Sequence, residues 1–252
     1  MKAICIIPAR YGSTRFPGKP LMKIGDKPMI QWVYERSSRA KTIEQVIVAT
    51  DDERIEQAVL GFGGQVVMTP GDLPSGSDRV AFAARQFAAD VIVNVQGDEP
   101  LIQAGLLDKI VSVFRDKRIR IATPIKKIKN QAQLTDANLV RVVRDNQHFA
   151  LYFSRSVIPY LRDVPNKDIW LEKHCFFKHI GVYAYRSAVL QEITKLPLSE
   201  LEAAERLEQL RFLENGYRIY TVETDYESWS VDTQEDLNKI NQLISEHALN
   251  VK

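Results

Sequence analysis

A group of positive charges follows the first apolar run of the chain. The run ends at Pro8, and the segment after it carries Arg10, Arg15 and Lys19 among small residues and two glycines. Fixed cations and closely approaching backbone N–H groups are the means by which proteins hold a multiply charged phosphate ester. The segment is therefore predicted to bind phosphate, and the alternative is a solvated charged turn.

The spacing within this segment excludes the two commonest phosphate-binding loops. A Walker A loop has four residues between its glycines and a serine or threonine after its lysine. Here five residues separate Gly12 from Gly18, and Pro20 follows Lys19. The dinucleotide fingerprint G-x-G-x-x-G is absent from the segment as well. The sequence therefore predicts a phosphate loop of another kind.

Two aspartates are candidates for binding a divalent cation. Asp98 comes directly after a buried strand and beside Gly97, where a carboxylate would face a ligand. Magnesium is usually held by one or two carboxylates together with phosphate oxygens and water. Asp232 is the best candidate for a second carboxylate, although an aspartate there could instead cap the last helix. Thr233 and Asp236 resemble a capping box, which would leave Asp232 free.

Composition indicates a soluble globular protein without a nucleic-acid partner. The 252 residues are 45% apolar and 26% charged, which is ordinary for such proteins, and the net charge is only +2. Two cysteines, Cys5 and Cys175, give neither a disulfide framework nor a metal-binding spacing. The first apolar run is too short for a signal peptide, and no stretch reaches the length of a membrane span. We expect a cytoplasmic protein.

The elements that must position these residues alternate between strand and helix in the first half. Strands are predicted at 4–7, 46–49, 65–69 and 90–95, and helices at 29–40, 53–60 and 78–87. Such alternation predicts an α/β, Rossmann-like, three-layer fold with a mostly parallel sheet. Ligands should then gather at the carboxyl ends of the strands.

The regular alternation of strand and helix ends after residue 118. Strands are predicted at 120–124, 140–144, 150–153 and 218–222, and helices in the region from Leu201 and from Gln234 onward. An irregular stretch at 159–173, containing Trp170, is either a flexible surface loop or a protruding element that pairs two subunits. No linker divides the chain, so one domain over 1–252 is expected, with a projecting segment around 120–180.

Residues 8–21 are similar to the signature of the nucleotide-sugar cytidylyltransferases. The likeness continues in consistent order at 48–52, 68–69, 75–79, 94–100, 150–155, 179–183, 207–211 and 231–233. The resemblance implies a nucleotide-diphospho-sugar transferase fold with a dimerisation extension, and therefore a homodimer. It also implies Mg²⁺-dependent transfer of CMP from CTP to the anomeric hydroxyl of 3-deoxy-D-manno-octulosonate (Kdo). The products would be pyrophosphate and CMP-Kdo, the activated form of Kdo for lipopolysaccharide biosynthesis.

The resemblance also carries residue roles to this chain. It gives metal ligation to Asp98 and Asp232, and makes both catalytic together with Lys19, which would neutralise the leaving pyrophosphate. Nucleotide binding is implied for Pro8, Ala9, Arg10, Gly12, Arg15, Lys19, Met68, Ser75 and Arg79. Sugar binding is implied for Gln96, Arg155, Arg162, His179, Tyr183, Glu208 and Gln209.

Several of these residues have structural explanations when the resemblance is set aside. Ser77 is expected to cap the helix that follows it. His179 could be a satisfied, partly buried histidine, and Glu208 and Gln209 could lie on the solvated face of a helix over 205–211.

The sequence leaves open three alternatives to transfer to Kdo. The first is cytidylyl transfer to another sugar acid, such as 8-amino-Kdo or a sialic acid. The second is a metal-dependent glycosyltransferase, although those usually carry an Asp-x-Asp pair where this chain has Gln96-Gly97-Asp98. The third is a catalytically silent nucleotide-binding protein, which the two retained aspartates disfavour.

Overall fold

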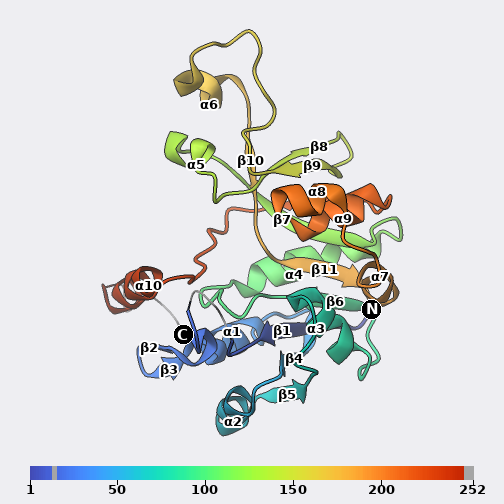
Figure 1. Cartoon of the computed structure of the whole chain (residues 1–252), viewed down its shortest axis with the longest axis vertical. Coiled ribbons are helices and arrows are strands. Elements are labelled where there is room, and N and C mark those ends of the chain that lie inside the picture. The colour runs from blue at the N-terminus through green and yellow to red at the C-terminus, as the bar shows by residue number, and fades with distance from the viewer. Residues whose placement is uncertain (13–15, 247–252) are drawn as a thin grey trace. The chain divides into compact units, whose positions relative to one another are not determined.

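The computed structural model describes residues 1–12 and 16–246, which divide into two compact units (Figure 1). Unit 1 comprises Met1–Val111 and Ser228–Lys252, and unit 2 comprises Ser112–Glu227. The expectations of one domain over 1–252 and of a projecting segment around 120–180 stay predictions.

Unit 1 is built on four parallel strands. Their spatial order is β5 (Gln65–Met68), β4 (Ile43–Thr50), β1 (Ala3–Ala9) and β6 (Val91–Asn94). Every residue of β1 and β6 is buried, as near-continuous apolar runs of parallel strands require. The predicted strands of the first half are confirmed. Because the strands are parallel, their carboxyl ends lie along one edge of the sheet.

Helices pack on these strands. They are α1 (Met29–Ser37), α2 (Glu53–Gly61), α3 (Gly76–Ala84), α4 (Ala104–Ser112) and α10 (Gln234–Glu246), with the short elements η1 (Lys19–Leu21), β2 (Lys23–Ile24) and β3 (Lys27–Pro28). α1 and α3 contact β1 and β4, whereas α2 contacts β4 and β5. Leu237 and Ile240 of α10 join Met29 and Trp32 in a buried cluster, which anchors the end of the described chain in unit 1.

Unit 2 contains a mixed sheet around β7 (Ile121–Lys127). β12 (Ile219–Glu223) runs parallel to β7, whereas β10 (Phe177–His179) and β11 (Tyr183–Arg186) run antiparallel to it. β8 (Arg141–Arg144) pairs with β10 and forms a hairpin with β9 (Ala150–Ser154). The helical elements are η2 (Val113–Arg115), α5 (Gln131–Thr135), η3 (Lys167–Ile169), α6 (Trp170–Lys173), α7 (Ser187–Ile193), α8 (Glu200–Glu205) and α9 (Glu208–Glu214).

The segment around Trp170 has its own small core, so its interpretation as a flexible surface loop is wrong. Trp170 is only 1% exposed and packs with Ile128, Leu134 and Phe176. Its indole N–H donates to the carbonyl of Val164 at 2.7 Å. An apolar cluster of this kind fixes a segment that has little regular secondary structure. The other interpretation, a surface between subunits, stays a prediction.

Trp170→Ala is therefore expected to destabilise the protein. Deleting a fully buried tryptophan removes its apolar contacts and leaves a cavity, which costs about 3–5 kcal/mol of unfolding free energy. Urea titration followed by circular dichroism measures the change. Trp229→Ala is the matched control because Trp229 is 39% exposed, and a clearly smaller loss is expected there. Equal losses for the two variants would show that the cluster around Trp170 contributes no special stability.

The two cysteines have opposite surroundings. Cys5 is fully buried in β1, and burial raises the pKa of its thiol to about 12. Cys175 is exposed, and neither thiol is in a disulfide. Among the helices in the described part of the chain, none has the length and apolar character needed to cross a membrane.

Candidate active site

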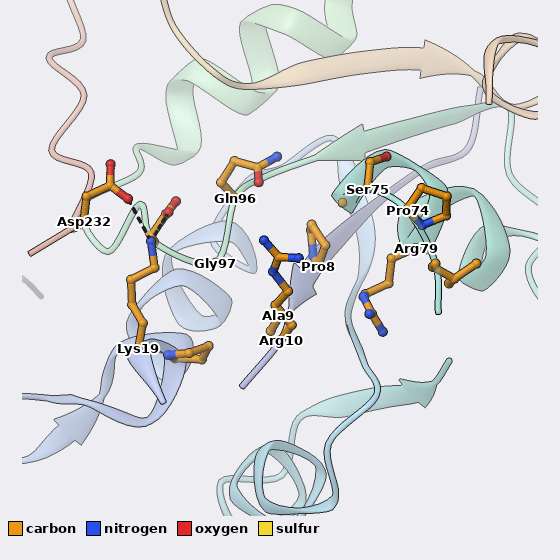
Figure 2. A pocket seen from close by; sticks show the side chains of 14 residues that line it. Pro8, Ala9, Arg10, Lys19, Pro74, Ser75, Arg79, Gln96, Gly97 and Asp232 are labelled. Atoms are coloured by element: carbon orange, nitrogen blue, oxygen red, sulfur yellow. Dashed lines mark hydrogen bonds and ion pairs between the residues drawn. The ribbon is translucent and has the colours of Figure 1, made fainter. Parts of the chain in front are cut away.

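A cavity of about 570 Å³ opens at the carboxyl edge of the parallel strands of unit 1 (Figure 2). It is lined by Pro8, Ala9, Arg10, Lys19, Pro20, Leu73, Pro74, Ser75, Gly76, Arg79, Gln96, Gly97, Asp98 and Asp232. The loops that follow β1, β5 and β6 supply most of this lining. The cavity is thus where a parallel α/β sheet is expected to bind its ligand.

Lys19 lies between the two predicted metal ligands. Its Nζ is 2.6 Å from a carboxylate oxygen of Asp98 and 3.1 Å from one of Asp232; Figure 2 shows Lys19 and Asp232 pointing toward one another. Burial lowers the pKa of Lys19, but the two carboxylates raise it by more, so the net shift is upward and the ammonium stays charged. Asp98 and Asp232, far apart in the sequence, thus hold the ammonium of Lys19 between them in the cavity.

The backbone explains how Asp232 reaches Asp98. The N–H of Val231 donates to the carbonyl of Asp98 at 3.0 Å, and the hydroxyl of Ser228 bonds to the buried carboxylate of Glu99. These contacts fasten the segment before α10 to the loop after β6. Asp232 is placed beside Asp98 by main-chain pairing rather than by its own side chain.

Thr233, and not Asp232, caps the last helix. The backbone N–H of Asp236 donates to the Thr233 hydroxyl at 3.2 Å, and the Asp236 carboxylate accepts from the Thr233 N–H at 3.0 Å. This is the reciprocal pattern of a capping box, as the sequence predicted. The carboxylate of Asp232 is consequently available to a cation.

The donor set at this position fits magnesium. Both carboxylates already converge on a positive group, and hard oxygen donors are what this ion prefers. Among the described residues there is no group of three or more histidine, cysteine, aspartate or glutamate side chains that could hold a metal. The remaining ligands would therefore have to come from phosphate oxygens and water, which is usual for magnesium.

Two glycines allow the backbone to form this cavity. Gly18 has φ +71, and its N–H donates to the carbonyl of Tyr11 at 2.9 Å, closing the loop after β1. A β-carbon at Gly18 would also lie 3.1 Å from the Tyr11 ring. At Gly97, a β-carbon would lie 3.1 Å from the carbonyl oxygen of Pro8. A larger residue at Gly97 would push the Asp98 loop away from the end of β1, and one at Gly18 would distort the loop after β1 itself.

Ser75, rather than Ser77, caps α3. The helix begins at Gly76, two residues earlier than predicted, and the Ser75 hydroxyl accepts from the backbone N–H of Asp78 at 3.1 Å. Ser77 is instead buried inside the helix. The prediction for Ser77 was wrong because serines at 75 and 77 both suit an N-cap, and Ser75 has the acidic partner three residues later. The N-terminus of α3 thus reaches the cavity, where Ser75 and Gly76 are part of the lining.

Arg79 is a buried cation held in one orientation at the cavity wall. It is 4% exposed, and its guanidinium bonds to the Thr69 hydroxyl and lies 3.0 Å from the carboxylate of Asp51. A guanidinium fixed in this way is preorganised for planar recognition. Arg79 lines the cavity, and its nucleotide-binding role stays a prediction.

The other nucleotide-side predictions divide into three groups. Pro8, Ala9, Arg10 and Lys19 line the cavity, and Arg10 has no hydrogen-bond or ion-pair partner among the described residues. Gly12 and Met68 do not line it, and Arg15 lies outside the described residues. Five further lining residues had no role assigned from the sequence: Pro20, Leu73, Pro74, Gly76 and Gly97. Three of them, Leu73, Pro74 and Gly76, lie in the segment 70–77 between the predicted strand over 65–69 and the predicted helix over 78–87. The proline and glycine content of this segment is the sequence signal that could have indicated these three residues.

Gln96 belongs to the cavity of unit 1, whereas the other predicted sugar residues belong to unit 2. The Gln96 amide donates to the side chain of Asn94 at 3.1 Å. In unit 2, the rings of His179 and Tyr183 lie 5.3 Å apart, and burial lowers the pKa of His179 to about 3. Burial, with Glu208 nearby, raises the pKa of Tyr183 well above its usual value. Both side chains are therefore neutral at pH 7.

The remaining predicted sugar residues do not share the aromatic surroundings of His179 and Tyr183; they are Arg155, Arg162, Glu208 and Gln209. The guanidinium of Arg155 donates to the carbonyl of Glu205 at 3.0 Å, and Arg162 is exposed. The predicted helix over 205–211 is wrong, because α8 ends at Glu205, Arg206 follows it with φ +56, and α9 begins at Glu208. Gln209 is 5% exposed, so it is not on a solvated face, and its amide nitrogen has no hydrogen-bond partner in the described structure.

Comparison with known proteins shows the family to which this fold belongs. Residues 4–225 match the model of the family described as cytidylyltransferase. The chain is 51% identical over 245 residues to a 3-deoxy-manno-octulosonate cytidylyltransferase of Parabacteroides distasonis, covering 95% of this chain and 96% of that protein. It is 48% identical to the protein of that name from Geobacter sulfurreducens, covering 95% of this chain and 98% of the relative.

A solved structure extends the likeness to three dimensions. The structure of a CMP:2-keto-3-deoxy-manno-octonic acid synthetase in complex with CTP superimposes with a TM-score of 0.91 at 44% identity. The match covers 98% of this chain and 99% of that one. The fold is thus the Rossmann-like fold of the nucleotidyltransferases, with a mixed, mostly parallel sheet and flanking helices, as predicted. The chain belongs to the cytidylyltransferase family.

Proposed function

We propose that this protein transfers CMP from CTP to the anomeric hydroxyl of Kdo, giving CMP-Kdo and pyrophosphate. The observation that carries the proposal is the convergence of Asp98, Asp232 and Lys19 in a cavity that Arg10 also lines. A nucleoside triphosphate needs cations for its phosphates, and its divalent ion needs carboxylates. Relatives about half identical over almost their whole length carry the name of this activity.

The residues of the chain act mainly by positioning and by charge. Arg10 and Lys19 bind the phosphates, and Lys19 neutralises the pyrophosphate as it leaves. Gly97 and Gly18 let the loops close around the nucleotide, while Arg79 reads the polar edge of the cytosine. No activated nucleophile is needed, because the sugar hydroxyl attacks the α-phosphorus in line.

Magnesium is part of this proposal, with Asp98 and Asp232 as its protein ligands. When bound, the ion supplies positive charge at the α-phosphate and makes the attacking hydroxyl more acidic. The two carboxylates fix where that charge lies relative to the loop after β1. The homodimer and the cytoplasmic location implied by the family resemblance stay predictions.

A pyrophosphate-release assay tests the proposal. Each of the four nucleoside triphosphates is combined in turn with Kdo, 8-amino-Kdo and a sialic acid, with and without magnesium. We expect release with CTP and Kdo in the presence of magnesium, and much less with UTP, whose base would leave buried polar groups unpaired.

This assay, together with calorimetry of CTP binding and an assay of transfer from a preformed nucleotide sugar, distinguishes the rival functions. If pyrophosphate release has a greater kcat/KM with another sugar acid than with Kdo, that acid is the acceptor and cytidylyl transfer is still the reaction. Tight CTP binding by calorimetry with no release for any acceptor would favour a silent nucleotide-binding protein. Transfer from a preformed nucleotide sugar would indicate a glycosyltransferase.

A further inference from the structure

Thr123 lies within β7 and is fully buried, with polar atoms of His179, Ile180 and Val182 around its hydroxyl and the Tyr183 hydroxyl also nearby. Its hydroxyl oxygen is 2.8 Å from the carbonyl oxygen of Val182, 3.3 Å from that of Ile180 and 2.9 Å from Nε2 of His179. All five residues belong to unit 2. Nothing in the family resemblance or in the sequence assigned a role to Thr123.

Proton counting decides the direction of these hydrogen bonds. A threonine hydroxyl has one hydrogen to donate, and a carbonyl oxygen can only accept. If the hydroxyl donated to His179, its oxygen would face the Val182 oxygen at 2.8 Å with no hydrogen between them. A buried polar contact of that kind is costly, so the hydroxyl donates to Val182 and accepts from His179.

We infer that Thr123 is a positioning residue that holds His179 as the neutral tautomer with its hydrogen on Nε2. The lone pair of the ring is then on Nδ1, which makes no hydrogen bond to the described residues. His179 consequently offers an acceptor to a ligand instead of a positive charge. The inference rests on the proposed function, in which His179 contacts the sugar. It specifies that contact as a hydrogen bond accepted by Nδ1.

The surroundings of the ring support a neutral imidazole. Phe153 lies edge-on to it with ring centroids 5.3 Å apart, and the Tyr183 ring is at the same distance on a tilted plane. Burial among these rings lowers the pKa of His179 to about 3, far below neutral pH. Aromatic neighbours provide no counter-charge that would favour the imidazolium.

A chemical class of partner follows from this state. A neutral ring with an Nδ1 lone pair accepts a hydrogen bond from a hydroxyl, whereas a sugar carboxylate has no hydrogen to donate and would be repelled by the lone pair. His179 therefore binds a hydroxyl of the acceptor sugar. The negative charge of a sugar acid must be recognised by other groups of the chain.

Nitrogen-15 NMR of the full-length protein tests the tautomer directly. The chain has four histidines, and His179→Gln identifies the resonances of His179 by their loss. Long-range ¹H–¹⁵N spectra at pH 7 should show a protonated Nε2 and an unprotonated Nδ1 in the wild type. Thr123→Ser should keep this pattern because it keeps the hydroxyl, whereas Thr123→Val, of similar shape, should shift it toward a mixture of tautomers.

Kinetics provide the second measurement. Thr123→Val should raise the KM for Kdo about fivefold to tenfold, the size of one neutral hydrogen bond, with the KM for CTP unchanged. Thr123→Ser should restore the wild-type value. A wild-type His179 with its hydrogen on Nδ1, or with both nitrogens protonated at pH 7, would overturn the inference, as would a Thr123→Val spectrum identical to the wild type. Failure of the proposed function would appear separately, as absent pyrophosphate release by a wild-type protein whose tautomer is as inferred.

Discussion

Asp98→Asn should lower kcat about a thousandfold or more while leaving the fold intact. The substitution keeps the size of the side chain but removes the charge that would fix a divalent ion in the cavity. Stabilisation of transition-state charge by a bound metal is worth several kcal/mol, and each 1.4 kcal/mol is a factor of ten in rate. Pyrophosphate release under saturating substrates measures the loss, and circular dichroism confirms that the variant folds.

Asp26→Asn is the matched control for this experiment. It makes the same change of charge on an exposed turn between β2 and β3, outside the residues that line the cavity. Wild-type turnover is expected for that variant. A rate for Asp98→Asn close to that of the control, at saturating magnesium, would remove Asp98 from the chemistry.

Lys19→Met should have two effects in opposite directions. Without the ammonium, the phosphates lose a fixed cation, so kcat/KM for CTP should fall by about a hundredfold or more. In the absence of CTP, however, the affinity for a divalent ion alone should rise about tenfold. The reason is that Lys19 already pairs with both carboxylates and must give them up before a metal can bind.

Titration with Mn²⁺, followed by electron paramagnetic resonance, measures the second effect without any turnover. Lys23→Met, which removes an exposed lysine of β2 outside the lining of the cavity, is the control and should leave both quantities unchanged. An unaltered Mn²⁺ affinity in Lys19→Met would show that the lysine and the metal do not compete for the same position. The fall in CTP use would then have to be explained by phosphate binding alone.

Sequence reasoning predicted the elements of unit 1 well because each carries a strong local signal. β1 and β6 are continuous apolar runs, and the alternation with helices fixes a parallel sheet. That topology alone places the loop after β1 and the loop after β6 at the same edge. The proximity of Lys19 to Asp98 follows from this topology. The phosphate-binding character of the loop around Arg10 was predicted from its residue types alone.

Other features could not be predicted because they depend on long-range contacts. Trp170 is in a stretch with polar composition, and only the packing of Ile128 and Phe176 reveals that it is buried. The break between α8 and α9 depends on one residue, Arg206, in a left-handed conformation that its side chain does not favour. The choice of Ser75 over Ser77 as a cap required the helix register. The predicted sugar-binding role of His179 came from the family resemblance, because the spacing of residues around it carries no such signal.

The main-chain bond from Val231 to Asp98 has a consequence for synthesis of the protein on the ribosome. Unit 1 is discontinuous, so Asp232 is added only after all of unit 2 has been translated. A nascent chain can form the parallel strands early, yet it cannot hold the ammonium of Lys19 between two acids until the final part emerges. Premature termination anywhere in unit 2 would therefore yield a polypeptide with the phosphate loop but without the second carboxylate.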